Sequence, residues 1–253
     1  MKFGFTSTSF RNIKDVEKVV SVAVKTGADC IEWGGDVHVK DVETAKRVRK
    51  LCDDAKISVS AFGSYYRVGN GDEKEWTKTC EIASALGTDL IRVWLGKTDS
   101  EKTEDAVYKS LVEEVKYMCE VASGYGLVVC PECHDHTYNN NTDAFLKMRK
   151  DVGMENFCTY FQSRYKKKAY DLDRIERTLP YIESVHISYW ELAREQFPKY
   201  NPSYMDELLD KLKDVGYDGS IVIEFTHPGY QMGFVPCMKR DIRRLKAKMV
   251  SKK

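Results

Sequence analysis

Eight short apolar runs alternate with amphipathic stretches along the chain, and this alternation constrains the fold more than any other feature. Between the runs, apolar residues recur at helical spacing, as in DVEKVVSVAVKTGA and EKEWTKTCEIASALG. Four of these stretches end in glycine, which favours the left-handed C-cap of a helix. Alternation of this kind is typical of an α/β protein with a parallel sheet. We predict β-strands at residues 2–6, 30–33, 57–62, 90–95, 127–132, 157–162, 184–187 and 221–224. The glycines are Gly27, Gly87, Gly126 and Gly216.

The number and spacing of these units predict a (β/α)8 TIM barrel. Eight strand-helix units repeat about every 31 residues over the 253-residue chain, and about 250 residues is usual for such a barrel. A doubly wound open sheet is the rival fold, but it favours a G-x-G-x-x-G turn after its first strand. Here the first strand is followed by TSTSFRN. Since no Gly/Ser-rich or Pro-rich linker divides the chain, we predict a single domain over residues 1–253.

Charge and apolar patterning exclude several classes of partner. Lys plus Arg is 40 and Asp plus Glu is 39, so the formal net charge is +1 and no basic excess favours a nucleic-acid partner. The first residues, MKFGFTSTSFRNIKD, contain no apolar segment of a signal peptide. No apolar run approaches the ~18 residues of a transmembrane helix. We therefore expect a cytoplasmic protein that binds neither nucleic acid nor a membrane.

The eight cysteines favour neither a disulfide framework nor a zinc site. Most of them fall inside predicted strands and helices, where reduced cysteine packs as a small apolar residue. Cys130 and Cys133 form a C-x-x-C, but side chains three apart on a strand point to opposite faces. No second C-x-x-C or nearby histidine pair completes a metal knuckle.

The alternation of side chains along each strand predicts which of them face the barrel interior. On the fifth strand Val128, Cys130 and Glu132 share a face, which we assign to the interior. The same parity points Glu32 inward on the second strand and Glu224 inward on the eighth. Buried carboxylates are costly unless they are paired, hydrogen-bonded or bound to a metal. Because the carboxyl ends of all eight strands open on one face, these carboxylates near the rim indicate a cation site.

Three short motifs at the ends of strands resemble a known family. They are the E-x-H of Glu132 and His134, the VHIS around His186 and the VIE that ends at Glu224. In order and spacing they resemble the xylose-isomerase-like barrel family of sugar phosphate isomerases and epimerases, over nearly the whole chain. Its members hold one divalent metal with Glu, Asp, His and Glu after strands five to eight. The resemblance implies that Glu132, Gln162, His186 and Glu224 are the metal ligands. Gln162 replaces the family's aspartate with a neutral amide oxygen, so we expect weaker metal binding.

The implied ligand set and the resemblance together predict a reaction. Two carboxylates, an amide and an imidazole suit Mn²⁺ best, with Mg²⁺, Co²⁺ and Zn²⁺ as alternatives. Such a cation stabilises the enediolate that forms when the proton next to a sugar carbonyl is removed. The resemblance implies that Glu132 and Glu224 act as the catalytic acid and base. We therefore expect a metal-dependent isomerase or epimerase of carbohydrate metabolism, acting on a sugar or sugar phosphate.

The C-terminal rim of the barrel also carries side chains that we expect to contact the substrate. Tryptophans there offer apolar walls for a sugar, and the basic loop SRYKKK at 163–168 offers contacts to an anion. Packing against the top of the barrel and solvation of the loop are the structural alternatives for these two groups. The expected substrate-binding residues are Glu32, His38, Trp94, His134, Arg164 and Trp190.

Other functions remain open at this point. A hydro-lyase of the inosose dehydratase type, which dehydrates a polyol ketone, uses the same enolising chemistry. Gln162 motivates a sugar-binding barrel without catalytic activity, in which the inward polar groups form a network without a metal. An abasic-site nuclease is disfavoured, because such enzymes use several metals and more than the five histidines present. The sequence also leaves open whether the protein is a homo-oligomer.

Overall fold

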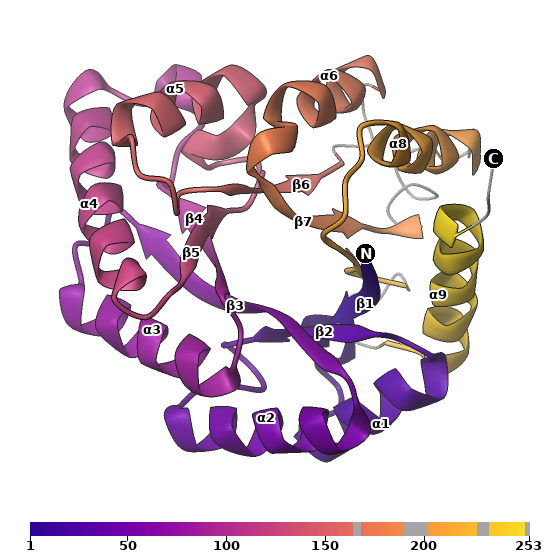
Figure 1. The fold of residues 1–253 in the computed structure, drawn as a ribbon. Coiled ribbons are helices and arrows are strands. Elements are labelled where there is room, and N and C mark those ends of the chain that lie inside the picture. Colours follow the sequence, from indigo (N-terminus) through magenta and orange to yellow (C-terminus); the bar gives the residue numbers. More distant parts are fainter. Residues whose placement is uncertain (164–167, 190–201, 227–232, 251–253) are drawn as a thin grey trace.

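A computed structural model describes residues 1–163, 168–189, 202–226 and 233–250. Within these residues eight parallel strands form one sheet in the order β5-β4-β3-β2-β1-β8-β7-β6, surrounded by helices (Figure 1). The predicted TIM barrel is thereby confirmed. The strands are β1 (Lys2–Thr6), β2 (Cys30–Gly34), β3 (Ser58–Val68), β4 (Leu90–Leu95), β5 (Val128–Pro131), β6 (Thr159–Gln162), β7 (Ile182–Ile187) and β8 (Ser220–Ile223).

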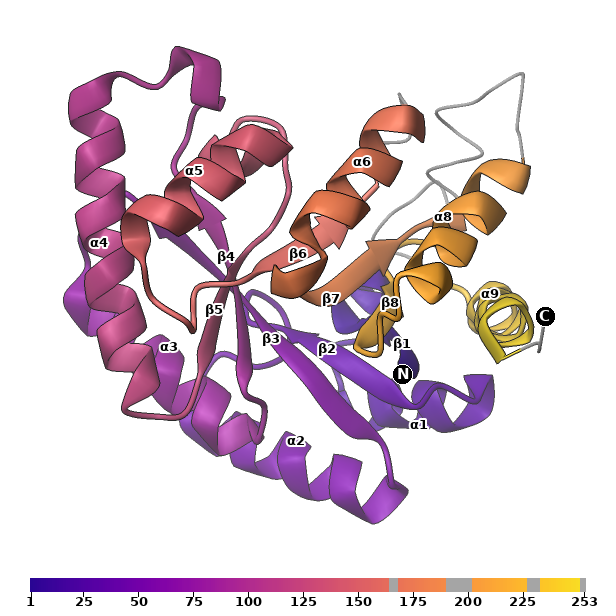
Figure 2. The same cartoon turned by 45° about the horizontal axis from the view of Figure 1, so that its top comes forward.

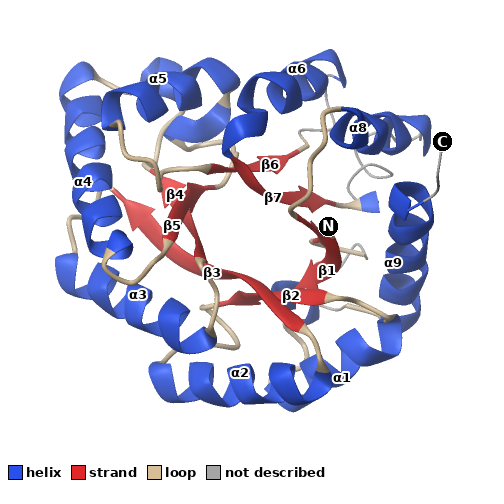
Figure 3. Ribbon diagram, in the orientation of Figure 1, coloured by secondary structure: helices blue, strands red, loops and turns tan. Residues whose placement is uncertain are grey.

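The barrel is closed on one side by pairing between the first and last strands. β1 pairs with both β2 and β8, so the two ends of the chain's sheet meet. Between β5 and β6 the contact is a single bridge from Val129 to Phe157. Two backbone bonds hold this junction, Val129 N to Asn156 O at 2.8 Å and Cys158 N to Val129 O at 2.9 Å. The ring of strands seen in Figure 3 is therefore nearly complete.

Helices cover the outer face of the strands, and in Figure 2 α4 and α5 lie across the barrel from α1 and α9. The four predicted C-cap glycines all have positive φ, from 70° to 77°. Gly27 and Gly87 are the C-caps of their helices, whereas the helix before Gly126 has Gly124 as its C-cap. Within the described ranges, no helix is both long and apolar enough to cross a membrane. The helices are α1 (Val16–Thr26), α2 (Val42–Ala55), α3 (Glu73–Leu86), α4 (Asp105–Ser123), α5 (Thr142–Val152), α6 (Lys168–Thr178), α8 (Pro202–Asp214) and α9 (Val235–Val250). Four 3-10 turns are η1 (Ser7–Phe10), η2 (Ser100–Lys102), η3 (Tyr138–Asn140) and η4 (Leu179–Tyr181).

Two apolar cores account for the packing. The larger one lies between the strands and the helices, and the smaller one lies among side chains on the inner face of the strands. The smaller core includes Leu90, Cys130, Cys158 and Tyr160, from β4 and the β5–β6 region. This supports the inward direction predicted for Cys130. Apolar groups therefore fill part of the barrel interior, and polar groups at the ends of the strands lie beyond them.

Several strand boundaries differ from the prediction by one or two residues, and that of the third strand differs by more. The sixth strand begins at Thr159 instead of residue 157, because the two residues before it make only the single bridge to β5. The third strand continues past residue 62 as far as Val68. Its pairing with β4 is interrupted after Gly63 and resumes at Arg67, which pairs with Trp94. This register shift extends β3 over the end of the barrel where the predicted site lies.

Candidate active site

Three of the predicted metal ligands converge at the carboxyl ends of their strands. Glu132 and Glu224 each follow the last residue of their strand, and His186 lies near the end of β7. His186 Nδ1 lies 3.9 Å from Glu132 Oε1 and 3.9 Å from Glu224 Oε2. One ligand atom from each residue lies within 4.8 Å of the other two. Their backbones are fixed by the sheet, since Glu132 N donates to Val93 O and Glu224 N donates to Ile187 O.

Gln162, the fourth predicted ligand, adjoins this group. It is the last residue of β6 and pairs with His186 in the sheet register. Its Nε2 donates to Glu224 Oε2 at 3.3 Å. Its Oε1 is buried and has no hydrogen-bond partner among the residues that the structure describes. A buried amide oxygen beside the Glu224 carboxylate is a suitable ligand for a cation.

The hydrogen bonding of His186 supports the same interpretation. Its Nε2 lies 2.7 Å from Glu32 Oε2, and this contact orients the ring. Its Nδ1 is buried without a partner in the described part of the chain, and it faces Glu132 and Glu224. Metal-binding histidines commonly use one ring nitrogen as ligand and donate the other N–H to a carboxylate. The donor set therefore fits a divalent cation on observations made within this structure.

A buried arginine that was not among the predicted site residues completes the group. Arg92 on β4 is 4% exposed, donates to Glu132 Oε2 through Nη1 and places Nε 3.3 Å from Glu32 Oε1. Burial by itself would lower the pKa of Arg92, but the Glu132 and Glu32 carboxylates raise it well above its usual value. Arg92 therefore stays charged and partly neutralises the carboxylates. Its parity with Trp94 on the fourth strand is the sequence signal that could have identified it.

The two proposed catalytic carboxylates have different environments. Burial tends to raise the pKa of Glu132, but Arg92 and His186 hold it below its ordinary value. Burial raises the pKa of Glu224 to about 7, with His186 opposing the shift and the Glu132 carboxylate adding to it. The Glu224 side chain is 15% exposed, compared with 3% for Glu132. Glu224 is thus the carboxylate more accessible to a small molecule.

The predicted substrate-binding residues differ in their position relative to the candidate site. Trp94 Nε1 donates to Glu132 Oε2 at 2.6 Å, and the Trp94 ring stacks on the exposed His134 with centroids 5.6 Å apart. Both residues therefore lie at the rim of the candidate site. Glu32 is 2% exposed and lies behind His186, where it orients the ring. Arg164 and Trp190 lie outside the described residues.

His38 has a separate environment. Its Nδ1 lies 3.0 Å from Ser7 Oγ and its Nε2 lies 2.8 Å from Ile13 O. Both ring nitrogens are therefore occupied by the segment that follows β1. Burial lowers the pKa of His38, which favours the neutral ring. These contacts give His38 a role in holding two loops together at this end of the barrel.

Tyr65 also lies beside the candidate site, on the irregular part of β3. Its backbone has φ 61°, a strained conformation for a residue with a large side chain. Its ring centroid lies 5.2 Å from the Arg92 guanidinium and 5.6 Å from the Trp94 ring. The Tyr65 hydroxyl also accepts a hydrogen bond from Arg11. The surrounding contacts thus fix Tyr65 against the group that holds Glu132.

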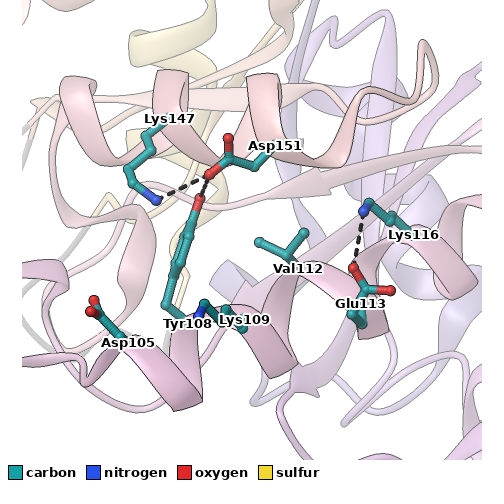
Figure 4. Close-up of a pocket in the computed structure, with 8 residues that line it drawn as sticks. All are labelled: Asp105, Tyr108, Lys109, Val112, Glu113, Lys116, Lys147 and Asp151. Carbon is teal, nitrogen blue, oxygen red and sulfur yellow. Dashed lines mark hydrogen bonds and ion pairs between the residues drawn. The ribbon is translucent and has the colours of Figure 1, made fainter.

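A separate groove of about 690 Å³ lies on the helical layer, between α4 and α5 (Figure 4). Asp151 there accepts hydrogen bonds from Tyr108 and from Lys147, the latter at 3.0 Å. Lys116 pairs with Glu113 at 2.9 Å on the other side of the groove. These charged groups satisfy one another. His186 Nδ1 and Gln162 Oε1, which have no hydrogen-bond partner among the described residues, are in the barrel. We therefore place the candidate site there.

Comparison with known proteins gives the same fold. A curated 3-dehydroshikimate dehydratase of Bacillus anthracis is 21% identical over 198 residues, covering 74% of this chain and 71% of that protein. The crystal structure of a probable 3-DHS dehydratase from Bacillus anthracis has a TM-score of 0.79 at 18% identity and covers 97% of this chain and 99% of its own. D-psicose 3-epimerase from Clostridium cellulolyticum H10 has a TM-score of 0.76 at 17% identity, covering 99% and 98%.

A third solved structure contains a metal. The IOLI protein, crystallised with a bound zinc atom, has a TM-score of 0.75 at 17% identity and covers 99% of this chain and 98% of its own. The family model described as a xylose isomerase-like TIM barrel matches residues 20–248. This match includes every strand from β2 to β8 and all of the candidate ligands. The chain therefore belongs to the xylose isomerase-like TIM barrel family.

Proposed function

We propose that this protein is a divalent-metal-dependent enzyme that removes the proton next to the carbonyl of a sugar-like substrate, and that it acts as an isomerase or epimerase. The observation that carries the proposal is the convergence of Glu132, His186 and Glu224 at one point. His186 Nδ1 faces both carboxylates and has no hydrogen-bond partner in the described part of the chain. Mn²⁺ is the cation that we favour for this mixed oxygen and nitrogen donor set. The solved relatives that are epimerases support this choice of reaction class.

The residues of the site would have different roles in such a reaction. A divalent cation bound there would polarise the substrate carbonyl and stabilise the negative charge that develops on its oxygen. Glu224 is the more exposed carboxylate and would accept the proton from the adjacent carbon. Protonation of that carbon on its opposite face by Glu132 would give an epimer, and delivery of the proton from Glu224 to the neighbouring carbon would give an isomer. Glu132, His186 and Gln162 would hold the cation.

Dehydration is a second candidate, favoured by the way Glu132 is held. Arg92 and Trp94 both donate to the same oxygen, Glu132 Oε2. A carboxylate restrained by a guanidinium and an indole N–H is a weak base, which favours chemistry that needs a single base. In that case Glu224 would take the proton, and the electron pair left behind would expel the hydroxyl one carbon further along, which would leave as water after taking that proton from Glu224. The curated dehydratase relative supports this reading.

Incubation with Mn²⁺ in deuterated water tests the proposal and separates the two reactions. The panel contains D-fructose, D-psicose, D-tagatose and 3-dehydroshikimate, followed by NMR and mass spectrometry. Isomerase or epimerase activity introduces deuterium without loss of mass as water. Dehydratase activity gives a product that lacks one water. If no member of the panel exchanges deuterium or loses water, the proposed enzyme is contradicted and a non-catalytic barrel is favoured.

Substitution of the two carboxylates assigns their roles. We expect Glu224→Gln to lower turnover by about 100-fold or more, the usual effect of losing a general base. For an epimerase, Glu132→Gln should reduce turnover similarly, whereas for a dehydratase it should act mainly by weakening metal binding. Glu81→Gln, at an exposed position on α3, is the matched control. Full turnover by both site variants would overturn the assignment.

A further inference from the structure

Arg67 is a cation beside the candidate site, on the part of β3 that the register shift extends. It pairs with Trp94 of β4 in the sheet register. Its guanidinium carbon lies 4.4 Å from the centroid of the Trp94 ring. One of its nitrogens, Nη1, donates to Gly96 O at 2.6 Å. Stacking and this single bond hold the planar group in one place, half-buried against the rim.

Arg67 differs from the neighbouring arginines because it has no acidic partner among the residues that the structure describes. Arg92 pairs with Glu32 and Glu132, and Arg11 pairs with Asp36. For Arg67, no carboxylate of residues 1–163, 168–189, 202–226 or 233–250 lies within ion-pair distance. Burial lowers the pKa of Arg67, with no carboxylate to oppose the shift. A guanidinium has five N–H donors, so most of the hydrogen-bonding capacity of Arg67 remains unused.

Trp94 connects Arg67 to the reactive end of the site. The indole N–H of Trp94 donates to Glu132, one of the three converging ligands, while its ring supports Arg67. One side chain therefore separates the unpaired guanidinium from the proposed metal ligand. A substrate held by its carbonyl near Glu132 and Glu224 could extend along Trp94 to Arg67. An anionic group at that end of the substrate would provide the missing partner of Arg67.

We infer that Arg67 binds an anionic group of the substrate, a carboxylate or a phosphate, so that the enzyme selects an anionic sugar or polyol derivative over a neutral one. This inference rests on the proposed function and specifies its substrate class. The guanidinium fork pairs with either group through two parallel N–H···O bonds. Neutral sugars of the same shape would leave Arg67 unpaired.

Matched pairs of ligands that differ in charge test the inference by binding alone. One pair is 3-dehydroshikimate and its methyl ester, and the other is D-fructose 6-phosphate and D-fructose. Dissociation constants are measured by calorimetry, first in metal-free protein and then with Mn²⁺. The comparison distinguishes binding of the anion to Arg67 from binding of the anion to the metal. In at least one pair we expect the anion to bind about tenfold more tightly than its neutral partner. The pair that shows this preference identifies the anionic group as carboxylate or phosphate.

Variants of Arg67 then assign the preference to this residue. Arg67→Gln should remove the tenfold preference and leave the affinity for the neutral ligand unchanged. Arg67→Lys keeps the charge without the planar fork, so it should retain part of the preference. Arg47→Gln, which removes an exposed arginine of α2 paired with Glu17 of α1, controls for the change in net charge. Circular dichroism checks that each variant is folded.

The outcomes separate this inference from the proposed function. If neither pair shows a preference for the anion, or if the preference survives in Arg67→Gln, the inference is wrong even where turnover is observed. If the anion is preferred through Arg67 but no panel member exchanges deuterium or loses water, the proposed reaction is wrong and the anion site stands.

Discussion

At the scale of single residues, the candidate site is a set of charges held in place by one another. Glu32 contacts both His186 and Arg92, and Arg92 in turn donates to Glu132. Burial tends to raise the pKa of Glu32, but His186 and Arg92 lower it, so the carboxylate stays ionised. A buried ion pair fixes geometry more reliably than it adds stability. Glu32 and Arg92 are therefore positioning residues for His186 and Glu132.

Glu32→Gln tests this positioning role. The amide keeps the size of the side chain but removes the negative charge that holds the His186 ring with Nδ1 directed at the site. We expect the affinity for Mn²⁺ to fall by 10- to 100-fold, as for other partners of metal-binding histidines. Calorimetric titration with Mn²⁺ measures the effect, with the exposed Glu17→Gln as control. Unchanged Mn²⁺ affinity in Glu32→Gln would show that His186 does not depend on Glu32.

At the scale of elements, the ends of the strands position the site residues, and a glycine of β3 provides the space for one of them. Gly63 lies where the regular pairing of β3 with β4 stops. A Cβ atom at Gly63 would lie 2.9 Å from Arg92 Nη2 and 3.2 Å from Glu32 Oε1. The space that Arg92 occupies therefore exists because residue 63 has no side chain. After Gly63, the backbone passes through the strained conformation of Tyr65, and pairing with β4 resumes at Arg67.

Gly63→Ala should consequently disturb the site through the strand. The methyl group would displace the Arg92 guanidinium from Glu32, and overpacking of this kind typically costs about 1–3 kcal/mol of stability. Urea unfolding and Mn²⁺ titration measure the two effects, and we expect both stability and metal affinity to fall. Gly124→Ala at the end of α4 is the control, because Gly124 has an ordinary helical φ of −61°. A Gly63→Ala protein with unchanged stability and metal affinity would contradict the tight fit of Arg92 against β3.

At the scale of the whole molecule, the described residues at the centre of the site include more acidic than basic groups. Glu32, Glu132 and Glu224 face one buried arginine and His186. A divalent cation would join β5, β7 and β8, the strands on either side of the weak junction between β5 and β6. Binding of such an ion to the folded state alone stabilises the protein by mass action.

Mn²⁺ should therefore raise the thermal unfolding temperature. At a free concentration of 100 times Kd the gain is about 2.7 kcal/mol. For a chain of this size that corresponds to roughly 5–10 °C in Tm. EDTA-treated protein should lose the gain, and the double variant Glu132→Gln/Glu224→Gln should show little of it. Equal stabilisation of the double variant would mean that Mn²⁺ binds elsewhere on the protein.

Local sequence patterns were sufficient to predict the barrel and the convergence of three inner polar residues at one end of it. Alternation along the strands assigned Cys130 to the interior, and the equivalence of parallel strand ends predicted that Glu132, His186 and Glu224 lie together. These features depend on periodicity within each segment and on the order of the segments. Both are properties of the chain before it folds.

Only the tertiary structure decided how the inner charges are paired and what lies at the rim. The Glu32–His186 contact joins residues 154 positions apart, and the Arg92–Glu132 pair depends on the register between two strands. The extension of β3 that places Arg67 on Trp94 follows from an irregularity that the apolar pattern does not reveal. Side-chain partners across strands are set by packing of the whole barrel, because many pairings of the same polar residues satisfy the sequence equally well.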